Sequence, residues 1–152
     1  MTSRKILLRT ALAAGVALTL LAGCGQMRPM GNTTIYEASL SGGQQVPPAV
    51  TPGSGNAELM LNTNTNLLRW KVTYSGLTGP ATAAHIHGPA PRGANAGVVV
   101  PFSGNLNAQP ITGEQTITPE QAAALANGQW YVNIHTARYP NGELRGQLGA
   151  RR

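Results

Sequence analysis

The chain has 152 residues, of which only 11% are charged, while 19 are glycine and 11 are proline. This length suits one domain with its own core, and the composition favours an all-β domain over a helical one. The chain contains no aspartate, and its five acids are Glu37, Glu58, Glu114, Glu120 and Glu143. We therefore do not expect hydrolysis by paired carboxylates or a carboxylate-rich calcium loop.

Residues 1–23 have the pattern of a lipoprotein signal peptide. A positively charged start precedes an apolar run at 11–22, which is too short to span a bilayer comfortably. The following Leu21-Ala22-Gly23-Cys24 resembles a bacterial lipobox, whose cysteine becomes the lipidated first residue of the mature protein. The alternative is an ordinary secretion signal with a stray cysteine, but Cys24 is the only cysteine of the chain.

Lipidation at Cys24 implies an extracytoplasmic protein that is anchored to a membrane by acyl chains. Gly25 follows the cysteine, which in a two-membrane envelope favours the outer membrane or cell surface. A lipidated thiol also excludes disulfides and cysteine ligands. After cleavage the mature chain keeps eight scattered basic residues and five acids, which gives a net charge of about +3. We therefore expect no nucleic-acid partner.

The mature chain reads as a tether (24–33) followed by one domain (34–150). Short β-patterned runs alternate with turns rich in glycine, proline and asparagine. Strands are predicted at 34–40, 56–61, 67–74, 83–87, 98–102, 130–136 and 143–148, with a hairpin turn at Asn141-Gly142.

One helix is predicted at 118–128, because Thr118 can cap it and Gln121 can complete a capping box. Seven or eight short strands with one short helix predict an all-β fold. The expected architecture is a Greek-key β-sandwich of immunoglobulin-like or superoxide-dismutase-like type.

The three histidines of the chain fall on two of these strands. Residues two apart on a strand share a face, so His85 and His87 lie together, opposite Ala84 and Ile86. By the same alternation His135 lies on the polar face of the strand at 130–136. Because the apolar face must enter the core, we expect all three histidines to point outward.

These histidines have two interpretations. They could simply face solvent, or they could bind one metal ion, for which all-nitrogen ligation suits copper or zinc. On the same polar face as His135, Tyr131 could line the site, and Asn133 could hydrogen-bond a ligating imidazole.

The sequence resembles the CHRD domain, a module named after chordin and found in many bacterial secreted proteins. The resemblance covers about residues 35–149 and rests on "YEASLSGGQQVPP", "AAHIHGPAPRGANAGVVVPF" and "WYVNIHTARYPNGELRGQL". It implies a β-sandwich with distant similarity to copper/zinc superoxide dismutases, but no settled biochemical activity.

The similarity to dismutases implies a role for four residues. Those enzymes hold copper with a His-x-His pair and a later histidine, which His85, His87 and His135 resemble. Arg145 resembles the arginine that draws superoxide to the copper. Apart from the resemblance, Arg92, in the loop after the His-x-His pair, is a weaker alternative for guiding an anion. The chain lacks the aspartate and further histidines of a zinc site, so the resemblance implies one copper ion per chain and no zinc. Glu143 could pair with Arg145 or with Arg138.

Three hypotheses follow. The first is a copper-only superoxide dismutase-like oxidoreductase of the cell envelope, with superoxide as its substrate and an antioxidant role. The second is a non-catalytic interaction or structural module with envelope protein partners. The third is a copper storage or delivery protein.

Overall fold

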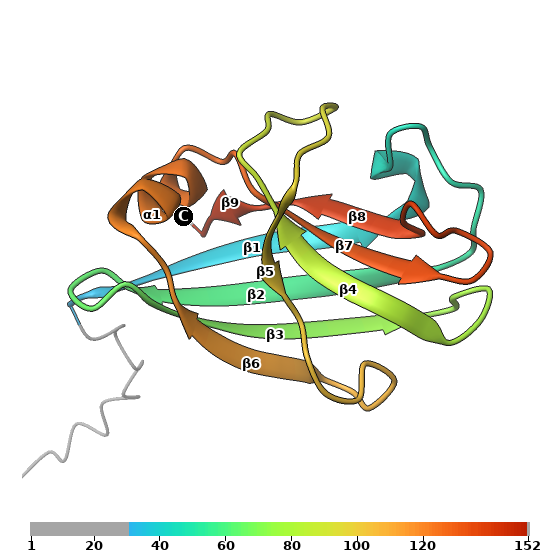
Figure 1. Ribbon diagram of the computed structural model, residues 1–152, viewed down its shortest axis with the longest axis horizontal. Coiled ribbons are helices and arrows are strands. Elements are labelled where there is room, and N and C mark those ends of the chain that lie inside the picture. The colour runs from blue at the N-terminus through green and yellow to red at the C-terminus, as the bar shows by residue number, and fades with distance from the viewer. Residues whose placement is uncertain (1–30, 152) are drawn as a thin grey trace, which may run out of the picture.

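A computed structural model describes residues 31–151 of the chain (Figure 1). The expected signal peptide (1–23), Cys24 and most of the tether (24–33) lie outside these described residues. Within the described part, no helix is long and apolar enough to cross a membrane.

The structure is an antiparallel β-sandwich with one short α-helix, as the sequence predicts. A short 3₁₀-helix (Gly42–Gln44) follows β1. The elements are β1 (Thr33–Ser41), β2 (Ser54–Asn62), β3 (Leu67–Ser75), β4 (Ala81–His87), β5 (Val98–Pro101), β6 (Ile111–Thr116), α1 (Pro119–Ala126), β7 (Tyr131–Thr136), β8 (Leu144–Gln147) and β9 (Gly149–Ala150).

The strands follow the order β5-β4-β7-β8-β1-β2-β3-β6, and β9 pairs with β1. Between β8 and β1 only Ser41 and Arg145 are paired, so the sheet bends there into two layers. Figure 1 shows β4, β7 and β8 in one layer and β1, β2, β3 and β6 in the other. The two predicted histidine strands, β4 and β7, are therefore direct neighbours.

The predicted strands and the helix are all present. Thr118 accepts a hydrogen bond from the backbone N–H of Gln121 in the predicted capping box. The sequence pattern did not predict β6, which pairs with β3. This edge strand has little apolar signal because Gly113, rather than a large residue, lies against the ring of Trp70. The two-residue β9 was also missed.

The core lies between the two layers. Leu59, Leu68 and Val72 of one layer and Ile86 and Ile134 of the other are fully buried. Trp70 and Phe102 stack at 5.0 Å between ring centroids at the edge of this core. Burial of these inward faces leaves the alternate residues of β4 and β7, including the histidines, on the opposite face of their layer.

A buried carboxylate ties the turn regions together. Glu143, which is 0% exposed, accepts hydrogen bonds from the hydroxyls of Thr51, Thr78 and Thr136 at 2.6–2.7 Å. The backbone N–H of Thr78 adds a fourth bond at 2.9 Å. The suggested pairing of Glu143 with an arginine is therefore wrong: threonine donors, which carry no charge, satisfy its oxygens.

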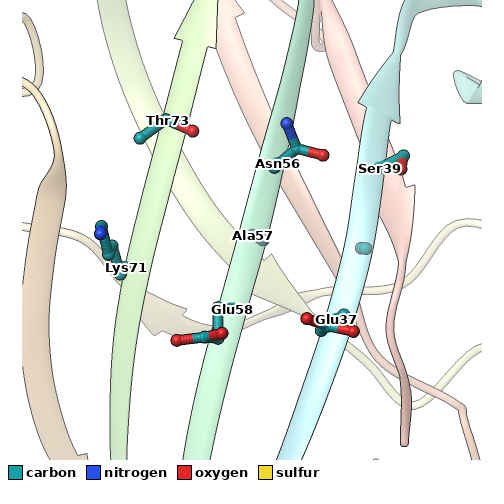
Figure 2. Close-up of a pocket in the computed structure, with 8 residues that line it drawn as sticks. Glu37, Ser39, Asn56, Ala57, Glu58, Lys71 and Thr73 are labelled. Atoms are coloured by element: carbon teal, nitrogen blue, oxygen red, sulfur yellow. The ribbon is translucent and has the colours of Figure 1, made fainter. Parts of the chain in front are cut away.

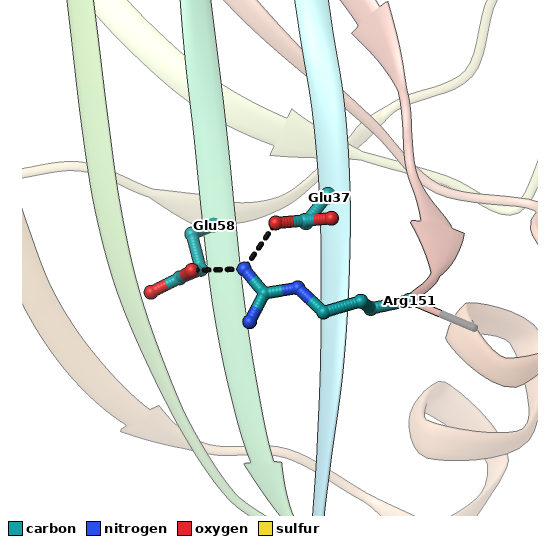
Figure 3. Close-up of polar contacts among 3 residues, drawn as sticks. All are labelled: Glu37, Glu58 and Arg151. Carbon is teal, nitrogen blue, oxygen red and sulfur yellow. Dashed lines mark hydrogen bonds and ion pairs between the residues drawn. The ribbon is translucent and has the colours of Figure 1, made fainter. Parts of the chain in front are cut away.

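The outer face of β1, β2 and β3 carries a polar groove of about 550 Å³ (Figure 2). Glu37 and Glu58 face each other directly across β1 and β2 in this groove, where like charges repel. Arg151 donates hydrogen bonds to both carboxylates (Figure 3). This contact offsets the repulsion and holds the chain after β9 against the sheet. The groove is lined by no histidine, so the candidate site lies elsewhere.

Candidate metal centre

The three histidines converge on the outer face of the layer formed by β4 and β7. In the antiparallel pairing His85 lies opposite Asn133, and His135 lies opposite Ala83, one step further along the same face. One ring nitrogen from each of His85, His87 and His135 can be chosen so that all three atoms lie within 4.8 Å of one another. The strand register therefore produces the cluster that the sequence predicts.

The histidines are more covered than expected. They do lie on the face opposite the core, but His87 and His135 are only 9% exposed, and His85 is partly exposed. The segment 94–97 covers His87 and the turn at Pro140 covers His135. The expectation of outward histidines on an open surface is thus corrected, because loops that join the strands fold back over this face.

Backbone carbonyls determine the tautomers of two of these histidines. His87 Nδ1 lies 3.0 Å from the carbonyl oxygen of Ala96, and His135 Nδ1 lies 2.9 Å from that of Pro140. A carbonyl oxygen can only accept, so each Nδ1 carries the proton and donates it. In the neutral rings Nε2 of both histidines therefore presents a lone pair, as a metal ligand must.

The remaining ring nitrogens differ in their contacts. His85 Nδ1 lies 3.2 Å from His135 Nε2, and with the tautomer above it donates to that lone pair. His87 Nε2 is buried and has no hydrogen-bond partner. A buried polar atom without a partner is costly and rare, so this nitrogen is available to bind a further group.

The separations suit a transition metal. Metal–imidazole bonds of about 2.0–2.1 Å place the ligating nitrogens roughly 3–4 Å apart. The His85–His135 distance of 3.2 Å already meets this requirement. The widest separation of up to 4.8 Å exceeds the upper end of this range by less than about 1 Å, a difference that side-chain rotation can close.

Burial favours the neutral form of two of the rings. Desolvation, and then the nearby rings of His135 and His87, lower the pKa of His85 below 6.5. Desolvation also lowers the pKa of His87, assisted by the charges of His135 and Arg145, although the Ala96 carbonyl opposes this shift. Neutral imidazoles are the form that binds metal.

Tyr131 supports His87 and its covering loop. The two rings stack with a centroid distance of 4.9 Å and an interplanar angle of 3°. The Tyr131 hydroxyl accepts from the backbone N–H of Ala96 at 3.1 Å and donates to its carbonyl at 3.3 Å. Tyr131 therefore contacts one histidine directly and positions the carbonyl that orients it.

Arg145 lies on the other side of Tyr131 from His87, because β7 separates β8 from β4. The side chain is 2% exposed and its guanidinium lies 3.6 Å from the centre of the Tyr131 ring. It donates to the Ala94 carbonyl at 2.7 Å and to Asn95 Oδ1 at 2.9 Å. Arg145 thus holds the loop that covers His87, and Tyr131 stands between it and the histidines.

Asn133 lies between Tyr131 and His135 on β7 and anchors a different loop. Its Oδ1 accepts from Gln45 Nε2 at 2.7 Å. No hydrogen bond joins Asn133 to an imidazole among the described residues. The bond to an imidazole that the sequence suggested is therefore not formed, and the side chain instead ties the loop after β1 to this face.

Sequence reasoning missed the two backbone carbonyls that orient the histidines, at Ala96 and Pro140. A carbonyl has no signature in the side-chain pattern, so the only available signal was the position of these residues in turns close to the histidine strands. Gln45 was missed because its partner, Asn133, is 88 positions away.

The protein is thus an all-β domain that carries a three-histidine cluster on the outer face of one layer. A model of the CHRD domain family matches residues 36–148, and the chain belongs to this family. No curated protein matches the chain, and no solved structure matches it.

Proposed function

We propose that the protein binds one copper ion through His85 Nδ1, His87 Nε2 and His135 Nε2. The observation that carries the proposal is the buried, unpartnered Nε2 of His87. Its ring belongs to a cluster in which one nitrogen of each histidine lies within 4.8 Å of the others. Metal binding would replace the His85–His135 contact, with the proton of the neutral His85 ring moving from Nδ1 to Nε2.

The donor set favours copper. Three imidazoles with no carboxylate suit copper, zinc or nickel, and affinity for a given nitrogen site is highest for Cu(II). The described residues also lack the aspartate and fourth histidine that would complete a second ion's site beside this one. We therefore propose one ion per chain and no zinc site.

Superoxide dismutation is the reaction we propose for the copper-bound protein. Copper would supply one-electron chemistry by cycling between Cu(II) and Cu(I), and three protein ligands leave a position for a small substrate. Arg145 would assist through its positive potential at His87 rather than by touching superoxide, since Tyr131 and the loop at 94–97 occupy its contacts.

We further propose that this activity belongs to the cell envelope. The support is the sequence of residues 1–24, with a charged start, an apolar run and a lipobox-like ending at Cys24. A protein anchored there by lipid would meet superoxide outside the cytoplasm, and it would carry no cysteine thiol that copper could oxidise.

The test uses the metal-free full-length chain in non-ionic detergent. Cu(II) is added, unbound metal is removed by dialysis, and copper per chain is measured together with the nitrogen hyperfine pattern in electron paramagnetic resonance. The wild type is compared with a His85→Ala, His87→Ala, His135→Ala variant and with Thr112→Ala, an exposed control on β6 in the other layer.

We expect one copper per chain in the wild type and the control, and none in the triple variant. Superoxide consumption above that of free copper, lost in the triple variant, would support the dismutase. Tight copper without consumption would leave a storage or delivery protein. Equal copper in the wild type and a folded triple variant would refute the metal site.

A further inference from the structure

A pocket of about 270 Å³ lies between the chain after β1 and the loop after β4. Two guanidinium groups, those of Arg92 and Arg145, line it. The side chains of Gln44, Gln45 and Gln147 complete its polar wall. This pocket is lined by none of the three histidines.

Neither arginine has a carboxylate partner among the described residues. Arg151 binds Glu37 and Glu58, and Arg69 binds Glu114. Threonines hold the carboxylate of Glu143, and Glu120 lies in the first turn of α1. A buried charge is normally paired, so Arg145 is unusual in having no acidic partner.

Neutral groups accept hydrogen bonds from some of the N–H donors of Arg145. Its guanidinium donates to Ala94 and Asn95, lies 3.5 Å from Gln147 Oε1 and covers the Tyr131 ring. These contacts use three of the five N–H donors that an arginine carries. They leave its positive charge without a counter-ion.

Arg92 adds a second positive charge to the same pocket. Its Nη1 donates to Gln44 Oε1 at 2.9 Å, which leaves its other donors free among the described contacts. Burial first, and then the charge of Arg92, lower the pKa of Arg145. Two like charges that face one cavity are stabilised when an anion is bound between them.

We propose that this pocket binds a small anion through Arg92 and Arg145, and that the ligand presents a phosphate or carboxylate group. The planar donor fork of arginine matches the oxygens of both groups. The volume of about 270 Å³ is below the range of about 300–1,000 Å³ usual for drug-sized ligands. A free small anion or one terminal group therefore fits, and a large ligand does not.

This site is separate from the proposed metal centre. Tyr131 stands between Arg145 and His87, so the anion would sit on the β8 side and the metal on the β4 side. The inference does not rest on copper binding. The triple histidine variant should consequently bind the anion as the wild type does.

The test is a titration of the metal-free full-length chain, in non-ionic detergent, with inorganic phosphate and separately with acetate. Binding is followed by NMR through the arginine Nε–H and glutamine side-chain amide signals. The variants are Arg92→Ala, Arg92→Lys and the control Arg138→Ala, an exposed arginine outside this pocket.

We expect saturable shifts with at least one anion, and the stronger of the two identifies the group that the site prefers. Arg92→Ala should weaken binding about tenfold or more, since a charged hydrogen bond contributes roughly 1.5–3 kcal/mol. Arg92→Lys should lose less, and Arg138→Ala should bind normally. Unsaturable shifts with both anions, or equal affinity in Arg92→Ala and wild type, would overturn the proposal.

Discussion

His85 Nδ1 lies 3.2 Å from His135 Nε2, although 50 positions separate the two residues in the chain. The contact exists because β4 and β7 are antiparallel neighbours, with His135 opposite Ala83 and thus diagonal to His85. The imidazole of His135 therefore lies near both histidines of β4, and its removal should affect the whole cluster.

We expect His135→Ala to lower copper affinity at least about 100-fold, since the loss of a group that only supports a ligand costs about 10–100-fold. Competition with a chelator of known affinity measures the change. Thr112→Ala is the matched control. If His135→Ala and the control bound copper equally, His135 would not be a ligand.

Tyr131→Phe keeps the ring that stacks on His87 and removes the hydroxyl that holds Ala96. The Ala96 carbonyl would then orient His87 less firmly, and we expect copper affinity to fall about tenfold. Tyr74→Phe is the matched control, because its hydroxyl also donates to a backbone carbonyl, that of Leu106, and Tyr74 lies on β3 in the other layer. Equal copper affinities in the two variants would argue against the positioning role of Tyr131.

Copper binding should weaken in acid. Protons compete with the metal for the ring nitrogens, and the pKa values of His85 and His87 are lowered below 6.5 by burial. Loss of copper should therefore begin at a lower pH than for an exposed histidine. An NMR titration of the metal-free chain from pH 8 to pH 4 measures the two pKa values, and a spectroscopic titration of the copper-loaded chain measures copper loss. A pKa at or above that of a free imidazole for both rings would contradict the lowering by burial.

Glu143→Gln should lower the free energy of unfolding by about 2 kcal/mol at pH 7, because an amide N–H₂ would face hydroxyl donors. Burial alone would raise the pKa of Glu143, but the bonds from Thr136, Thr51 and Thr78 lower it overall. The stabilisation is thus present above the unfolded pKa and is lost as pH falls through the folded pKa.

Urea unfolding at pH 7 and at steps down to pH 3 measures both effects for Glu143→Gln. The control is Glu114→Gln, which removes an exposed ion pair with Arg69 worth about 0–1 kcal/mol. The difference between wild type and Glu143→Gln should shrink in acid. A difference that stays constant with pH would show that the carboxylate charge plays no part.

Gly142→Ala should be destabilising for two reasons. Gly142 has φ +122°, which other residues rarely adopt, and a Cβ there would clash with Asn133 Oδ1 and lie 2.5 Å from Gln45 Nε2. We expect a loss of about 2–3 kcal/mol. Gly104→Ala separates the two causes, since Gly104 also has a positive φ but has open space around it.

Thermal unfolding of both glycine variants measures this comparison. Gly104→Ala should lose only about 1 kcal/mol, the conformational cost. The prediction is wrong if the two losses are equal, because the contact with Asn133 would then contribute nothing.

Local pattern predicted most of the fold. Alternation placed β4 and β7 with Ile86 and Ile134 inward, and the capping residues Thr118 and Gln121 marked the start of α1. These signals are local, since a strand face or a capping box depends on residues a few positions apart. β6 was not predicted because its apolar signal is weak and because its partner, β3, lies far away in the sequence.

The sequence by itself determined which face of its strand each histidine occupies, because side chains alternate along a strand. Only the tertiary structure decided that β4 and β7 are neighbours, that the carbonyls of Ala96 and Pro140 orient two of the rings, and that Tyr131 separates Arg145 from His87. These relationships depend on strand order and loop closure over tens of residues, which no local pattern of side chains specifies.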